Sequence, residues 1–242
     1  MSEKETCVIV GAGSGLGLGL ATVFSKAGYR VVLARRNLQA AQEMAAGLLA
    51  AGHDVHARAV DAREPEAVRL LFEDIQASLG PIDVLVFNVG GNIRSSLFDT
   101  TPETFEALWR TNTFAGFIVA QAAAREMIKR GRGTILFSGA TASVRGGNGF
   151  AAFAAAKNGL RAVAQSFARE LAGQGIHVAH VVIDGGIDSP RMRQTQQQRV
   201  TDAGVDGLLL PQSIAQAYLN LHRQPRDAWT FEMDLRPWSE RW

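Results

Sequence analysis

Cysteine is nearly absent from this chain, because Cys7 is the only one among 242 residues. A single cysteine excludes an internal disulfide and a cysteine-based metal site, and we predict no metal site. Long hydrophobic runs are lacking too: after the charged start MSEKET, the apolar run CVIV is far too short for a signal sequence or a membrane span. We therefore expect a soluble cytoplasmic protein that does not enter a membrane.

An excess of charge of one sign is also missing, since 25 basic and 23 acidic side chains leave a formal net charge of +2. No basic stripe with interleaved aromatic residues occurs, so we expect no nucleic-acid partner. The chain is 47% hydrophobic, which is enough apolar material for one sizeable core, and its length is too short for two ordinary domains. These features predict one domain over residues 1–242.

Short β-branched runs alternate with longer alanine-rich amphipathic segments, the pattern of βαβ units that form a parallel sheet. Seven strands are expected at 6–11, 29–34, 54–61, 83–88, 133–139, 177–184 and 229–235. Helices are expected at 16–27, 37–51, 64–79, 102–130, 150–173 and 211–223. We therefore predict a Rossmann-type, doubly wound α/β domain with helices on both faces of its sheet. The polar, weakly periodic stretch 186–210 is typical of a mobile lid or substrate loop.

A glycine-rich run, VGAGSGLGLG at residues 10–19, follows the first expected strand. The ordinary dinucleotide-binding spacing fits no register of this run, and no Gly-Lys-Ser/Thr completes a Walker A loop. Such a turn lets the backbone approach a pyrophosphate, which the amino end of the next helix attracts. The alternative is that the glycines only permit close packing of helix on strand. The predicted cofactor contacts here are Gly11, Gly13, Ser14, Gly15, Leu16 and Gly17.

The side chains at the end of the second strand distinguish NAD from NADP. A carboxylate there would bind the ribose of NAD, whereas an arginine would bind the extra phosphate of NADP. The sequence has Arg35 and Arg36 there and no acid. Because the planar guanidinium suits a phosphate dianion, these residues favour NADP(H) over NAD(H). Ordinary surface charge at a strand end is the alternative.

The spacing of Gly11, Gly15 and Gly17, together with the βαβ pattern, resembles the classical short-chain dehydrogenase/reductase family, which acyl-carrier-protein ketoreductases typify. The resemblance covers nearly the whole chain. It implies a small-molecule substrate and further cofactor contacts. The positions that match the family's cofactor-binding residues are Asp61, Ala62, Asn88, Gly90, Lys157, Ile187 and Ser189.

Some of these matches leave alternatives open. Asp61 would reach the adenine amino group or instead cap the next helix. Asn88 and Gly90, in FNVG, would hold the turn beneath the adenosine and ribose, or serve the turn alone. The family's Pro-Gly after the sixth strand is replaced by Asp184 and Gly185, and this departure makes the register of the nicotinamide neighbours Ile187 and Ser189 uncertain by one residue.

The family's catalytic set is an asparagine, a serine, and a tyrosine four residues before a lysine. Asn112 and Lys157 match this set, whereas Phe153 stands at the tyrosine position. Counting back thirteen residues from Phe153 reaches Ala140, where the family has its serine. The resemblance therefore implies that both hydroxyls that handle the proton are missing.

Substitutes for the missing proton donor lie close by in sequence. Ser143 is our first choice because it lies just beyond Ala140, although a loop hydroxyl that bonds its own backbone is the simpler role. Ser138, Thr141, Asn148 and Lys157 are further candidates. Lys157 could deliver a proton directly or through water, since a desolvated lysine can titrate near neutral pH.

Two main functional hypotheses follow. The first is an NADP(H)-dependent oxidoreductase that acts on a carbonyl or related small hydrophobic substrate with a non-standard proton donor. The second is a catalytically silent NADP(H)-binding module, and a scaffold without cofactor is a third. Small residues in helices 102–130 and 150–173 allow close helix packing, and the resemblance implies a homodimer through them. The tail, with Trp238 and Trp242, would add a contact for a homotetramer.

Overall fold

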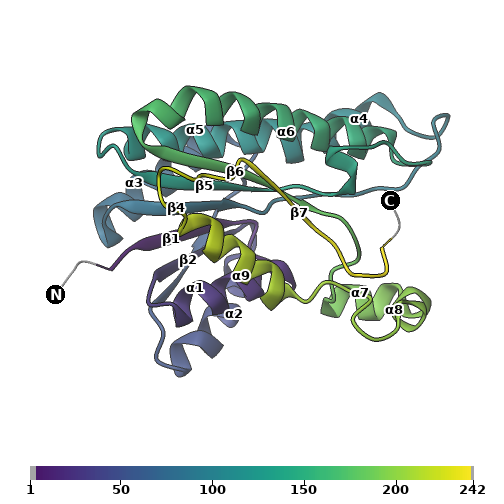
Figure 1. Cartoon of the computed structure of the whole chain (residues 1–242), viewed down its shortest axis with the longest axis horizontal. Helices are drawn as coiled ribbons and strands as arrows, with labels where there is room; N and C mark the ends of the chain where they lie inside the picture. The colour runs from purple at the N-terminus through teal and green to yellow at the C-terminus, as the bar shows by residue number, and fades with distance from the viewer. Residues whose placement is uncertain (1–3, 241–242) are drawn as a thin grey trace.

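The computed structural model describes residues 4–240 and contains one seven-stranded parallel sheet in the order β3-β2-β1-β4-β5-β6-β7 (Figure 1). The predicted α/β fold class is confirmed. Nearly continuous Val, Ile and Leu runs form the central strands, because both faces of a parallel sheet are covered by helices. The strands are β1 (Thr6–Val10), β2 (Arg30–Arg35), β3 (Val55–Ala59), β4 (Ile82–Phe87), β5 (Gly133–Ser138), β6 (Ile176–Ile183) and β7 (Glu232–Leu235).

Helices cover the two faces of the sheet as separate layers (Figure 1). One layer holds α1 (Leu16–Lys26), α2 (Leu38–Ala50) and α9 (Pro211–His222), which pack on one hydrophobic cluster. The other holds α3 (Pro65–Leu79), α5 (Ala115–Ile128) and α6 (Ala151–Leu171), which pack on a second cluster. Between residues 4 and 240, no helix is long and apolar enough to cross a membrane.

The sheet reverses its strand order between β1 and β4, which pair as neighbours although β2 and β3 lie between them in sequence. The connections after these two strands lead to opposite faces, so a crevice opens beyond their carboxyl ends. Ligands of doubly wound folds bind in this crevice. The topology therefore places the loops after β1, β4, β5 and β6 around one site.

The expected helix 102–130 is divided by a π-helical turn, Arg110–Phe114, which separates α4 (Pro102–Trp109) from α5. Asn112 lies in this turn, and its Nδ2 donates to the carbonyl of Leu108 at 2.9 Å. A side chain that bonds the backbone in this way competes with the regular helical ladder. Single π-turns inside helices occur frequently at functional sites.

The stretch 186–210, here called the lid, contains two short helices, α7 (Pro190–Thr195) and α8 (Gln197–Ala203). The sequence predicts a mobile lid or substrate loop here and neither of these two helices. Ser189 caps α7, since its hydroxyl accepts from the backbone N–H of Met192 at 3.2 Å, and Pro190 occupies the first helical turn. This Ser-Pro start signal is present in the sequence, but the segment is too short for a clear helical period.

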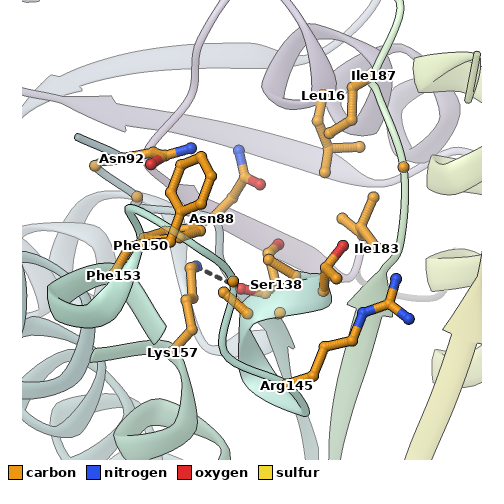
Figure 2. A pocket seen from close by; sticks show the side chains of 18 of the residues that line it. Leu16, Asn88, Asn92, Ser138, Arg145, Phe150, Phe153, Lys157, Ile183 and Ile187 are labelled. Carbon is orange, nitrogen blue, oxygen red and sulfur yellow. Dashed lines mark hydrogen bonds between the residues drawn. The ribbon is translucent and has the colours of Figure 1, made fainter. Parts of the chain in front are cut away.

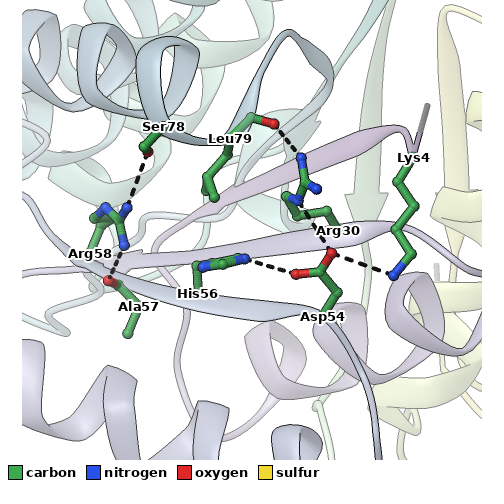
Figure 3. Close-up of polar contacts among 8 residues, drawn as sticks. All are labelled: Lys4, Arg30, Asp54, His56, Ala57, Arg58, Ser78 and Leu79. Carbon is green, nitrogen blue, oxygen red and sulfur yellow. Dashed lines mark hydrogen bonds and ion pairs between the residues drawn. The ribbon is translucent and has the colours of Figure 1, made fainter.

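A polar cluster ties strands together at the amino ends of β2 and β3 (Figure 3). Asp54 accepts hydrogen bonds from His56 at 2.8 Å, from Arg30 at 3.3 Å and from Lys4 at 3.4 Å. Arg30 also donates to the carbonyl of Leu79, at the end of α3. Because the crevice lies at the opposite ends of the strands, we assign this cluster to the structure of the sheet and not to the site.

Candidate active site

Two cavities lie at the carboxyl ends of the strands. The Lys157 cavity, of about 570 Å³, is formed by the loops after β4, β5 and β6 and by the lid (Figure 2). The Arg36 cavity, of about 630 Å³, is formed by the loops after β1, β2, β3 and β4. Both include the turn 88–92 and Arg191. The two cavities therefore meet at a waist between that turn and the lid.

The first glycines shape the floor of the Arg36 cavity. Gly11 has a φ of +90°, and a Cβ there would lie 2.5 Å from the backbone nitrogen of Val89. Asn88 holds the turn after β4 close to Gly11, since its Nδ2 donates to the carbonyl of Gly11 at 3.0 Å. Gly13 lines the cavity with open space around it, whereas a Cβ on Gly17 would lie 2.7 Å from the Cα of Ala12. Gly17 thus serves helix packing, and Gly11 and Gly13 shape the cavity.

The next residues of the glycine run face the Lys157 cavity and the lid. Leu16, the first residue of α1, lines the Lys157 cavity. A Cβ on Gly15 would lie 3.0 Å from the Cβ of Ser189, so the start of the lid rests on this glycine. Ser14 is exposed and lines neither cavity, and Ser189 lines neither cavity either.

Basic side chains dominate the far end of the Arg36 cavity, where Arg35, Arg36, Asp61, Ala62 and Arg63 line it. Asp61 forms an ion pair with Arg63, at 2.5 Å and 2.9 Å, and this pairing lowers the pKa of Asp61 to about 2. The helix α3 takes its N-cap from Glu64, so the alternative role of Asp61 as a helix cap is wrong. Because Arg63 balances the negative charge of Asp61, the charges of Arg35 and Arg36 give this end of the cavity a net positive surface.

Lys157 lies in the wall of its cavity with 5% of its surface exposed. Its Nζ donates to the backbone carbonyl of Ser138 at 2.9 Å (Figure 2). Burial lowers the pKa of Lys157 to about 8, because removal from water disfavours the ammonium form. A cation whose pKa lies this near neutral pH can release and recover a proton under ordinary conditions.

Asn112 stands next to Lys157 across Gly90. Its Nδ2 donates to the carbonyls of Leu108 and Gly91, at 2.9 Å and 3.3 Å. Its buried Oδ1 has no hydrogen-bond partner among residues 4–240. This oxygen and the Nζ of Lys157 each lie 3.7 Å from the point that a Cβ on Gly90 would occupy. The glycine thus keeps open a polar space between an acceptor and a donor.

The positions matched to the family's serine and tyrosine also meet at this cavity. Ala140 lines this cavity. So do Phe153, Lys157 and Phe150, which are labelled in Figure 2. Ser143 does not: it is fully buried, and its hydroxyl accepts from the backbone N–H of Ala140 at 3.1 Å. The expectation that Ser143 replaces the missing hydroxyl therefore fails on geometry.

A comparison with known families identifies the family of this chain. A model of the short chain dehydrogenase family matches residues 5–200. The chain belongs to the short-chain dehydrogenase family. It is accordingly an oxidoreductase of the short-chain dehydrogenase type, and the resemblance drawn from the sequence is confirmed at this level.

Individual members of the family cover nearly the same length. A solved short-chain dehydrogenase from Rhodopseudomonas palustris is 40% identical, with a TM-score of 0.83 over 97% of this chain and 99% of that one. A 3-oxoacyl-[acyl-carrier-protein] reductase of Bos taurus is 29% identical over 194 residues, 80% of each chain. A metagenomic short-chain oxidoreductase in complex with NADP is 25% identical, with a TM-score of 0.82 over 98% of this chain and 99% of that one.

The Lys157 cavity of this short-chain dehydrogenase is also lined by residues that the sequence pattern does not single out. Ile187, a predicted nicotinamide neighbour, lines the Lys157 cavity, and so do Arg145, Arg191 and Arg199. Asp184 is buried beside the cavity, where its Oδ1 accepts from the hydroxyl of Thr141 at 2.5 Å. A scattered set of arginines on a loop and two short helices has no period or fixed spacing, so only the fold brings them together.

Proposed function

We propose that this short-chain dehydrogenase uses NADP(H) to reduce a carbonyl or related group of a small hydrophobic substrate, with Lys157 as the proton donor. The observation that carries the proposal is the buried Lys157 ammonium in a cavity that also holds Phe153 and Ala140. Phe150, Phe153, Ile183 and Ile187 give this cavity an apolar lining that suits a hydrophobic substrate.

The residues present fit a dinucleotide. Two cavities joined at a waist match a ligand with two lobes, and the open face of Gly13 leaves room for phosphates. The Lys157 ammonium has three N–H groups, and one of them donates to the carbonyl of Ser138. The other two are available to ribose hydroxyls. When bound, NADPH supplies the hydride. These features support binding of the adenosine half at Arg36 and of the nicotinamide half at Lys157.

Cofactor preference gives a first prediction. The double variant Arg35→Ala/Arg36→Ala is expected to raise the Kd for NADPH by about 10- to 100-fold, because two charge-assisted contacts to the 2′-phosphate are lost. The Kd for NADH should change less than threefold, roughly the scatter of such contacts. Fluorescence titration measures both constants. Arg58→Ala, on β3 and paired with Asp74 at 2.6 Å, is the control; equal losses for NADPH and NADH would contradict the assignment.

The proton path follows from the polar atoms around Lys157. We assign Ala140 and Phe153 to the positions of the family's serine and tyrosine, where neither side chain carries a proton. Among the described residues that line the cavity, Lys157 alone carries an ammonium, and its lowered pKa suits a general acid. The unpaired Oδ1 of Asn112 supports a role in holding a water that returns the proton to Lys157.

The pH dependence gives a second prediction. Reduction requires the protonated amine, so the rate should be constant at low pH and fall as pH rises through about 8, the pKa of Lys157. Phosphates of a bound cofactor favour the ammonium and would move this midpoint upward. Burial lowers the pKa of His180 to about 4, so that neighbour stays neutral over the same range. A rate profile with no inflection near or above pH 8 would exclude Lys157 as the acid.

The experiment that tests the proposed function is NADPH oxidation by the purified protein with a panel of ketones, diketones, quinones and enones. Turnover with any member supports the oxidoreductase proposal. Tight NADPH binding without turnover of any member would favour the alternative, a silent NADP(H)-binding module, and absence of NADPH binding would exclude both.

We also propose that the protein forms a homodimer through α5 and α6. Phe117 on α5 is 39% exposed although it packs edge-on against Phe167 of α6, which leaves an apolar strip along this pair of helices. Trp238 is 80% exposed and would add a tetramer contact, whereas Trp242 lies outside the described residues. The cytoplasmic location stays a prediction.

A further inference from the structure

Arg191 occupies a position that no other residue of the lid shares. Within residues 186–210, Ile187, Arg191 and Arg199 line the Lys157 cavity, but only Arg191 also lines the Arg36 cavity. The opposite wall of the waist is the turn 88–92. Any ligand that fills both cavities must therefore pass between this turn and Arg191.

The backbone around Arg191 is held in place at both ends of the lid. Ser189 rests on Gly15 of the glycine turn and caps α7, and Met192 is buried. Two backbone hydrogen bonds join the two ends of the lid. The N–H of Leu209 donates to the carbonyl of Gly186 at 2.8 Å, and the N–H of Asp188 donates to the carbonyl of Leu209 at 2.9 Å. The waist position of Arg191 is therefore a consequence of the fold and not of a loosely placed loop.

The charge of Arg191 is not used inside the protein. No hydrogen bond or ion pair joins its guanidinium to another residue in the range 4–240. Its neighbour on the same helix, Arg193, forms a two-point ion pair with Asp188, with both contacts at 2.6 Å. Of the two arginines on α7, Arg193 is therefore paired with a carboxylate, that of Asp188, and Arg191 is not.

We propose that Arg191 binds the pyrophosphate of NADPH across the waist, so that cofactor binding holds the lid over the site; the inference rests on the proposed cofactor. The pyrophosphate carries two negative charges and joins the two halves of the cofactor. It is therefore the part that lies between the Arg36 cavity and the Lys157 cavity. A guanidinium offers it two parallel N–H donors, and the glycine turn offers backbone N–H groups from the other side.

The test compares Arg191→Gln with the matched variant Arg193→Gln in the full-length protein. Arg191→Gln is expected to raise the Kd for NADPH roughly 10- to 100-fold, as for the loss of a charge-assisted pair. It should leave the Kd for adenosine 2′-phosphate unchanged, because that ligand lacks the pyrophosphate. Arg193→Gln should keep the parent's Kd for both ligands. An equal loss in the two variants, or an equal loss for the two ligands, would overturn the proposal.

Amide hydrogen exchange of α7 and α8 gives a second measurement that does not depend on activity. Saturating NADPH should slow exchange in 190–203 in the parent and in Arg193→Gln, and not in Arg191→Gln. If the parent binds NADPH while Arg191→Gln binds it equally and shows equal protection, the role of Arg191 is excluded and the proposed function stands. If the parent fails to bind NADPH, the proposed function itself is excluded.

Discussion

Replacing Lys157 by methionine is expected to lower the rate of NADPH-dependent carbonyl reduction by about 10²- to 10⁴-fold, the contribution of a positioned general acid. Methionine keeps most of the side-chain volume and removes the proton. The folded state should remain stable, because the variant no longer buries a cation that is 5% exposed. Single-turnover measurement at saturating NADPH separates this loss from weaker cofactor binding.

Two further variants sharpen this experiment. Lys157→Arg keeps a positive charge but cannot release its proton near neutral pH, so it should be as slow as Lys157→Met if the proton matters. Lys129→Met, at the C-cap of α5 and paired with Glu126 at 2.8 Å, is the surface control and should keep the parent's rate. Activity of Lys157→Met within a few-fold of the parent would contradict the role of Lys157 as the acid.

Restoring both hydroxyls with Ala140→Ser/Phe153→Tyr is expected to raise the rate of ketone reduction by at least about 10²-fold. A tyrosine at 153 lies one helical turn before Lys157 on the same face of α6, so the ammonium would lower the pKa of its phenol. A serine at 140 would donate to the developing oxyanion. The measurement is the ratio of kcat/KM between the double variant and the parent with the same ketone.

The chain offers a matched control for this gain. Phe150→Tyr adds a phenol to the same cavity without the four-residue spacing to Lys157, and it should not reproduce the gain of the double variant. A double variant that is no faster than the parent, or a Phe150→Tyr variant that gains as much, would show that Ala140 and Phe153 do not occupy the proton-transfer positions.

The fold was predictable because its signals are local and repeated. The central strands are short apolar runs, the helices that cover the sheet are longer and amphipathic, and the glycine turn marks the first crossover. The cavity-lining residues Gly11, Gly13, Arg35, Arg36 and Asn88 lie at strand ends, where the topology of a parallel sheet collects them. Their grouping in one cavity could therefore be inferred without coordinates.

The rest of the site depends on details of side-chain direction that no spacing reveals. Ser143 is near Ala140 in sequence, but the short turn 141–143 directs its hydroxyl back to the backbone. The π-turn at Asn112 is accompanied by side-chain hydrogen bonds to the carbonyls of Leu108 and Gly91, and it leaves no periodic trace in the sequence. Arg191 lies at the waist in a segment that is held partly by the contact of Ser189 with Gly15, which spans 174 positions of chain.

The most direct test of the account is the transfer of deuterium from NADPH labelled at the nicotinamide C4 to a carbonyl acceptor, followed by mass spectrometry of the product alcohol. With both C4 hydrogens of NADPH replaced by deuterium, we expect labelled alcohol with the unmodified protein and about 10²- to 10⁴-fold slower formation of that labelled alcohol with Lys157→Met, at cofactor concentrations that saturate both. Tight binding of labelled NADPH by the unmodified protein, with no label in any product of the panel, would contradict it and identify the protein as a binder of the cofactor alone.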